Sequence, residues 1–252
     1  MKTWNLHMIA FIAVIGLNAS VFAQDDDEHG HSDVEFAYED GKIAIEFSDE
    51  GAVFEGEFST EGVDLQFTSE PGFGSEGEEG LGINAGDQIV YNVLSELMYW
   101  NDGFKPVPGG AQIRIVNRPP SPVVPDTIIG ADTAIQFGSF VPALNRIGAG
   151  EADGDLHSDL DFLLEPKGDT ADSALFGVYG FLLSLSTDEA GVAASDPFAM
   201  VFNFGVEEEK FAIGVGAFAN VVPEPSGYTI VLSVCVLAFG CIRRRRICSK
   251  NQ

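Results

Sequence analysis

Short runs of alternating apolar and polar residues, each closed by turn-forming residues, fill the middle of this 252-residue chain. In KIAIEFS (42–48), Ile43, Ile45 and Phe47 share one face, because successive side chains of a strand point to opposite sides. Similar runs, bounded by Gly, Pro, Asp or Asn, are VDLQF (63–67), QIVYNVL (88–94), QIRIVN (112–117), AIQFGSF (134–140) and AMVFNFG (199–205). This pattern predicts an all-β fold, an antiparallel sandwich of jelly-roll type.

Turn and loop signals divide these runs. Asp40-Gly41 predicts a hairpin between VEFAY and KIAIEF. VLSELMYW (93–100) is the only short candidate for a helix, and a strand suits it equally well. The acidic, Gly-rich stretch 69–80 and the stretch 117–126, which holds four prolines, are expected to be loops. Either loop could separate two subdomains, but one sandwich with long loops is the simpler expectation.

The first 23 residues have the layout of a secretory signal peptide. Lys2 precedes an apolar stretch, and small residues lead up to Ala23. We therefore expect an N-terminal signal helix, Sec-type export, and cleavage by signal peptidase between Ala23 and Gln24.

The C-terminal region predicts a single membrane helix. The stretch from Tyr228 to Ile242 is mostly apolar and would be roughly 22 Å long as a helix. A bilayer core needs about 20 apolar residues, so this span is marginal. The positive-inside rule places the arginines that follow it in the cytoplasm and the rest of the chain outside.

The order of motif, apolar span and basic end resembles the PEP-CTERM sorting signal. The residues that carry the resemblance are Val222, Pro223, Glu224 and Pro225, followed after the span 228–242 by Arg243, Arg244, Arg245 and Arg246. The resemblance implies recognition by an exosortase, a membrane-embedded cysteine peptidase of Gram-negative bacteria that secrete exopolysaccharide. It also implies that the protein is held in the inner membrane only transiently, before it reaches the envelope surface or the extracellular matrix. The expected domains are thus a signal peptide (1–23), an ectodomain (24–222) and a sorting signal (223–252).

The ectodomain is strongly acidic and contains no cysteine. Residues 24–222 hold 7 Lys and Arg against 38 Asp and Glu, which gives a formal charge of −31. Such a domain repels phosphate backbones, so we expect no nucleic-acid partner. Metal ions or basic polymers suit it better, although the charge could serve solubility alone. Cys235, Cys241 and Cys248 lie in the tail, so neither a disulfide nor a cysteine nucleophile is expected in the ectodomain.

A second resemblance concerns the ectodomain itself. The segment HGHSDVEFAYEDGKIAIEF (29–47) is similar to the opening of the surface-anchored repeat domain of choice-of-anchor M proteins, with Tyr38, Asp40 and Gly41 at its turn. GDLHSDLDFLLEP (154–166) and GVYGFLLSLS (177–186) resemble later strands of that family. The chain departs from the family in having fewer histidines. The resemblance implies a cell-surface protein, and some members of that family are linked to metal acquisition.

Two strings suggest a divalent-metal site. HGHSD places two histidines and one carboxylate at alternate positions, and HSDLD one histidine and two carboxylates, and a strand projects alternate positions to one face. If the two strands pair, their ligands converge in a mixture that suits Zn²⁺. The candidate ligands are His29, His31, Asp33, His157, Asp159 and Asp161. The alternative is an ordinary solvent-facing strand.

Other chemistry is less well marked. Oxygen ligands for Ca²⁺ are offered by Glu151, Asp153, Asp155 and Asp159, but their spacing is not that of an EF-hand. No nucleophile elbow, phosphate-binding loop or His-Glu-x-x-His motif is present. We therefore predict a non-enzymatic exported envelope or matrix protein, with exopolysaccharide as a candidate partner. A metal-binding surface protein is the second expectation, and a carbohydrate-active enzyme with a carboxylate pair is the third.

Overall fold

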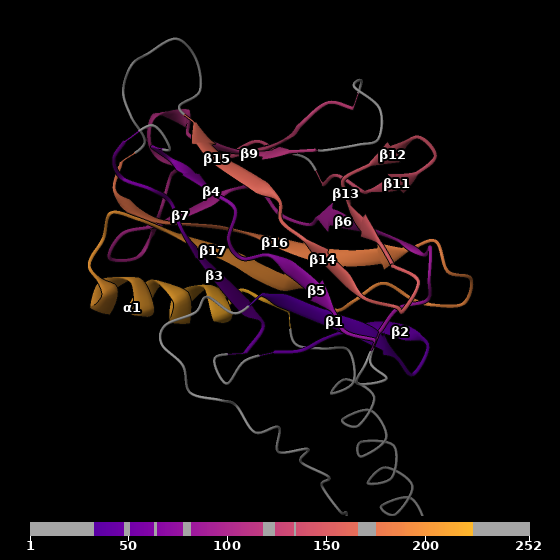
Figure 1. Cartoon of the computed structure of the whole chain (residues 1–252). Coiled ribbons are helices and arrows are strands. Elements are labelled where there is room, and N and C mark those ends of the chain that lie inside the picture. Colours follow the sequence, from indigo (N-terminus) through magenta and orange to yellow (C-terminus); the bar gives the residue numbers. More distant parts are fainter. Residues whose placement is uncertain are drawn as a thin grey trace, which may run out of the picture. The chain divides into compact units, whose positions relative to one another are not determined.

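The structure is a computed structural model that describes residues 33–47, 51–62, 65–77, 82–117, 124–133, 135–165 and 175–223. These residues all belong to one compact unit, His31–Gln252, whereas Met1–Gly30 is a separate unit outside the described residues. In the described part strands prevail and one α-helix is found, which confirms the prediction of a mostly β protein (Figure 1).

The largest sheet has seven strands. Its path runs β13-β6-β16-β17-β3, and β7 pairs with β16 and with β8. The strands are β3 Val53–Glu57, β6 Gln88–Val93, β7 Met98–Trp100, β8 Phe104–Lys105, β13 Arg146–Ala149, β16 Gly177–Thr187 and β17 Phe198–Phe204. All of β17 and nearly all of β16 are buried, because both faces of these strands are covered. This explains their almost unbroken apolar sequences.

Two four-stranded sheets and one hairpin complete the β structure. The first sheet has the order β14-β5-β1-β2 and the second β10-β9-β15-β4, while β11 pairs only with β12 among the described strands. The first contains β1 Val34–Glu39, β2 Lys42–Ile45, β5 Phe73–Ser75 and β14 Leu156–Ser158. The second contains β4 Phe67–Thr68, β9 Gln112–Val116, β10 Thr127–Gly130 and β15 Asp161–Glu165. The hairpin is β11 Ser139–Phe140 with β12 Ala143–Leu144, and the 3₁₀ turn η1 is Pro108–Gly110.

One apolar core joins the three larger sheets. Phe36 of β1, Ile113 of β9 and Phe202 of β17 belong to the same buried cluster. The neighbouring residues of β17, Ala199 and Val201, point the other way and belong to a second cluster that includes residues of α1. The two four-stranded sheets therefore cover one face of the central sheet, and α1 packs on the other.

The prediction of a purely antiparallel fold is wrong at two places. β1 pairs with β5 in parallel, with Val34 opposite Phe73. β17 pairs with β3 in parallel, with Ala199 opposite Val53. Parallel partners need a long connection between them, which no local turn signal in a sequence reports.

The helix α1, Glu208–Ala219, was missed by the sequence analysis. Its inner side buries Phe211, Val215 and Phe218 against the central sheet. Its outer side is also largely apolar, so the sequence lacks the polar stripe that marks a surface helix. Two interior glycines weaken the signal further. Gly214 is required for packing, because a Cβ there would lie 2.8 Å from Val178 Cγ2.

The local predictions had mixed outcomes. The Asp40-Gly41 hairpin is confirmed: both residues have positive φ, 50° and 77°, and β1 pairs with β2 across them. Strands are confirmed within 88–94, 112–117 and 199–205. The stretch 93–100 is no helix but contains the last residue of β6 and all of β7. The predicted loop 69–80 contains β5, and the predicted strand 134–140 has only β11 at its end.

No helix among the described residues is long and apolar enough to cross a membrane. The predicted signal helix and the apolar stretch 228–242 both lie outside the described residues.

Candidate functional site

The sheet β14-β5-β1-β2 has one outer face that carries acids, one histidine and glycines. Its register places Glu35 and His157 on either side of Gly74 in the intervening strand β5. The alternate residues Val34, Phe73 and Leu156 point into the core. The local cause is the period-2 pattern of each strand, which sends every second side chain outward.

Two carboxylates converge over Gly72, just before β5. A Cβ placed on Gly72 would lie 3.0 Å from Asp33 Oδ1 and 2.9 Å from Asp159 Oδ1. The backbone N–H of Gly72 also donates to Asp33 Oδ1 at 2.9 Å. Because glycine has no side chain, the two carboxylate oxygens can approach the backbone of Gly72 this closely.

Glu35 is next to a second carboxylate on the same face. Burial, together with the negative charge of Glu46 and a hydrogen bond with it, raises the pKa of Glu35 above its usual range. The charges of Glu76 and Asp33 act in the same direction. A proton or a cation would relieve this repulsion, which is the main electrostatic property of the face.

The predicted metal ligands are only partly brought together. Asp33 and Asp159 meet over Gly72, and His157 lies two residues along β5, opposite Gly74. The two strands do not pair directly as predicted, because β5 lies between them. His29 and His31 lie outside the described residues. In the described ranges, no three His, Cys, Asp or Glu side chains form a group that could hold a metal ion.

The expectation for Asp161 is wrong. β14 ends at Ser158, and Asp161 begins β15, which belongs to the other four-stranded sheet. The buried Leu160 lies at the crossing between the two sheets. The alternation of HSDLD therefore does not continue along one strand.

The four residues of the calcium hypothesis do not form a site either. All four are described, and no three of them make a ligand group. Asp155 Oδ1 instead accepts a hydrogen bond from the N–H of Gly77 at 2.6 Å. The N–H of Glu151 donates to the carbonyl of Asp155 at 2.8 Å. Asp155 therefore serves to hold this loop against the end of β5.

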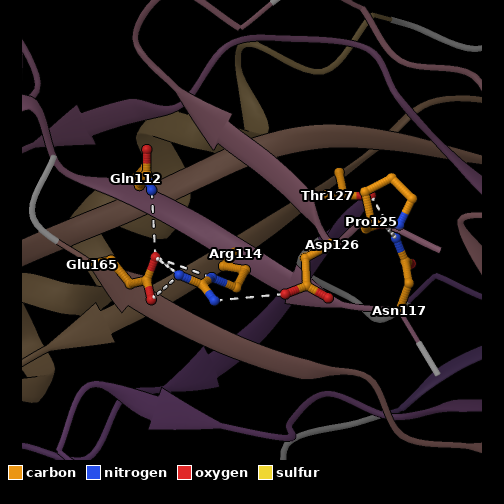
Figure 2. A network of polar contacts seen from close by, with 7 residues as sticks. All are labelled: Gln112, Arg114, Asn117, Pro125, Asp126, Thr127 and Glu165. Atoms are coloured by element: carbon orange, nitrogen blue, oxygen red, sulfur yellow. Dashed lines mark hydrogen bonds and ion pairs between the residues drawn. The ribbon is translucent and has the colours of Figure 1, made fainter. Parts of the chain in front are cut away.

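A cross-strand ion network that the sequence analysis missed lies on the outer face of the second sheet (Figure 2). Arg114 of β9 lies 2.7 Å from Glu165 Oε1 of β15 and 3.6 Å from Asp126 Oδ2, just before β10. Nearby, Asn117 Nδ2 donates to the carbonyl of Pro125 at 2.9 Å. These contacts join the two ends of the proline-rich stretch 117–126. The partners are far apart in sequence, so no local motif marks them.

The other notable feature is an apolar groove of about 440 Å³ beside the β7–β8 hairpin. Its walls include Leu97, Tyr99, Phe104 and Val107, and Val221, just beyond α1, closes one side. Lys105 and Glu96 are the charged residues of its lining. The sequence alone does not show this groove, because α1 was not expected.

Comparison with protein-family models, with curated proteins and with solved structures finds no match for this chain.

Proposed function

We propose that this chain is an exported, non-enzymatic envelope or extracellular-matrix protein of a Gram-negative bacterium, delivered through a PEP-CTERM tail that an exosortase recognises. Signal peptidase and Sec-type export act first, and the inner membrane holds the chain until sorting. The ectodomain, as a jelly-roll-like sandwich, is the part that is delivered. The observation that carries the proposal is the pairing of the export signal, residues 1–23, with the motif, span and arginines of residues 222–246.

The position of the motif relative to the fold supports this proposal. α1 ends at Ala219, and Val222 and Pro223 follow within four residues. The motif therefore begins directly after the last element of the described fold. Pro223 and Pro225 disfavour helix at this point, which leaves an extended backbone for a peptidase to bind.

Expression of the full chain in a Gram-negative host, with and without an exosortase, tests the proposal. We expect an N-terminus at Gln24 in both cases and loss of the C-terminal tail only when the exosortase is present, measured as intact mass. Replacement of Pro223 and Pro225 by Ala should prevent the loss. Pro120→Ala, in the proline-rich stretch, is the matched control and should leave processing unchanged. Full-length protein in the cytoplasm with residues 1–23 still attached would contradict the proposal.

Divalent-cation binding, to Zn²⁺ or Ca²⁺, is the second candidate function. It is favoured by the convergence of the Asp33 and Asp159 carboxylates over Gly72, with His157 on the same face. Carboxylate and imidazole together suit Zn²⁺ or a similar ion. His29 and His31 would have to supply the further ligands.

Calorimetric titration of the chain from Gln24 onward, after chelation, tests this second function. A saturable Zn²⁺ site should disappear in His31→Ala, His157→Ala and Asp159→Asn. Asp161→Asn is the matched control, because the structure places Asp161 in the other sheet. Unchanged affinity in the first three variants excludes this site.

A further inference from the structure

We propose that the groove beside the β7–β8 hairpin rests on the lipid interface of the membrane while the C-terminal tail is held there. This inference deepens the proposed function and rests on it, because it requires residues 228–242 to be the membrane segment. The occupant of the groove surface is lipid: headgroups and the upper part of the acyl chains.

Exposed apolar side chains mark this surface. Phe104 is 47% exposed and Val221 is 37% exposed, and both line the groove. On the solvent side of α1, Ile213 is 59% exposed. No charged residue occurs from Phe211 to Pro223, although the ectodomain has a formal charge of −31. Apolar side chains near a membrane are stabilised by burial at the boundary between headgroups and acyl chains.

The length of the chain keeps the groove close to the membrane. Five residue steps separate Pro223 from Tyr228, and a fully extended chain spans at most roughly 18 Å over five residues. The headgroup layer on each side of a bilayer accounts for roughly 5–8 Å of its thickness. Val221 lies two residues before Pro223, so the tether keeps this surface within roughly 25 Å of the start of the membrane segment.

Charge favours lipid over a second copy of the chain. Another copy would bring a second domain of −31 into contact, whereas a zwitterionic bilayer carries no net charge. Glu207, Glu208 and Glu209 at the start of α1 would be repelled by anionic lipid. Docking should therefore be strongest on phosphatidylcholine and weaken as phosphatidylglycerol is added.

Tryptophan quenching in nanodiscs of brominated phosphatidylcholine, with the chain from Gln24 onward, tests the proposal. In Phe104→Trp, the added fluorescence over that of the parent chain should be quenched by the bromolipid. Val141→Trp is the matched control, because Val141 is 91% exposed in the turn between β11 and β12, on the other side of the unit from β7 (Figure 1). Its added fluorescence should not be quenched. Adding Val221→Glu to Phe104→Trp should abolish the quenching, and circular dichroism checks that the fold is retained.

The outcomes separate this inference from the function on which it rests. A chain that co-purifies with nanodiscs but shows no quenching of Phe104→Trp, or equal quenching of both sensors, overturns the inference and leaves the tail as a membrane segment. A chain that does not co-purify with nanodiscs overturns the membrane segment and the inference with it. The third outcome concerns lipid-free detergent, with a soluble quencher in place of the bromolipid. If the added tryptophan of Phe104→Trp becomes less accessible to that quencher as protein concentration rises, the groove binds a second copy of the chain, and the inference is overturned.

Discussion

The hydroxyl of Tyr91 donates a hydrogen bond to the side-chain oxygen of Asn117 at 2.7 Å, with both residues buried. Tyr91 lies on β6 of the central sheet and Asn117 directly follows β9 of a smaller sheet, so the bond crosses the core between two sheets. Thr127 extends the network by donating to Asn145 Oδ1 at 2.8 Å. Burial raises the pKa of Tyr91, so its hydroxyl remains a donor at neutral pH.

Removing this hydroxyl should destabilise the domain. Tyr91→Phe leaves the buried oxygen of Asn117 without this donor, and we expect a loss of about 1–3 kcal/mol in the free energy of unfolding. Urea denaturation measures it. Tyr179→Phe is the control. The Tyr179 hydroxyl donates to the carbonyl of Leu175, and because Leu175 is exposed, water can replace the lost hydroxyl as the donor. A loss as large for Tyr179→Phe would show that the network has no special role.

The two glycines of α1 should respond to alanine in opposite ways. Gly214→Ala places a Cβ 2.8 Å from Val178 Cγ2 and 3.1 Å from Trp100 Cε3, so we expect a loss of about 1–3 kcal/mol from overpacking. Gly216 has nothing within 4 Å of the same position, and alanine there should stabilise the helix by about 0.5–1 kcal/mol. Thermal unfolding of both variants provides the measurement. Equal effects would mean that α1 does not pack closely on β16.

The ion pair between Arg114 and Glu165 should be measurable by a double-mutant cycle. Arg114→Gln and Glu165→Gln, alone and together, should give a coupling of about 0.5–1 kcal/mol, which decreases at high salt. Lys210 and Asp102 form the comparison pair, since the Asp102 side chain is 76% exposed. Their coupling should be smaller. Equal coupling of the two pairs would remove any special role for the additional hydrogen bond that Arg114 Nε donates to Glu165 Oε2 at 3.1 Å.

The acidic face should make stability depend on pH. The pKa of Glu35 is raised in the folded state, mainly by burial and then by the charge of Glu46. A carboxyl with a raised pKa destabilises the fold when ionised, so its contribution improves as pH falls from above its folded pKa towards its unfolded value. In Glu46→Gln, stability at neutral pH should rise and this dependence should weaken. Chemical denaturation across the weakly acidic range measures both, with Glu61→Gln, in an exposed turn, as the control.

Part of the fold was predictable because it depends on neighbouring residues. The alternation in β2 and β9 and the Asp40-Gly41 turn are encoded within a few positions, and the structure contains them. The parallel pairing of β1 with β5 was not predictable, because β5 is only three residues long and lies in a Gly-rich acidic stretch that reads as a loop. α1 was missed because its outer side is apolar, which removes the contrast on which a helical pattern depends.

The candidate site shows the same division. The sequence placed Asp33 and Asp159 on outward positions, and the structure brings both to Gly72. It also placed Asp161 with them, which is wrong because the chain changes sheets after Ser158. A two-residue period continues in a sequence even where the strand ends. Gly72 itself has no sequence signal, since its role depends on strands that come from distant parts of the chain.

The parallel pairing of β3 with β17 has a consequence for how the molecule is made. Val53 finds its partner Ala199 only after 146 further residues have been synthesised, so the central sheet cannot be completed before then. Contacts this distant in sequence form slowly, and incomplete sheets leave unpaired edges exposed. Until residue 204 has been synthesised, the central sheet lacks β17 and is incomplete. A chain cut short before β17 should therefore be a substrate for proteases rather than a smaller version of the fold.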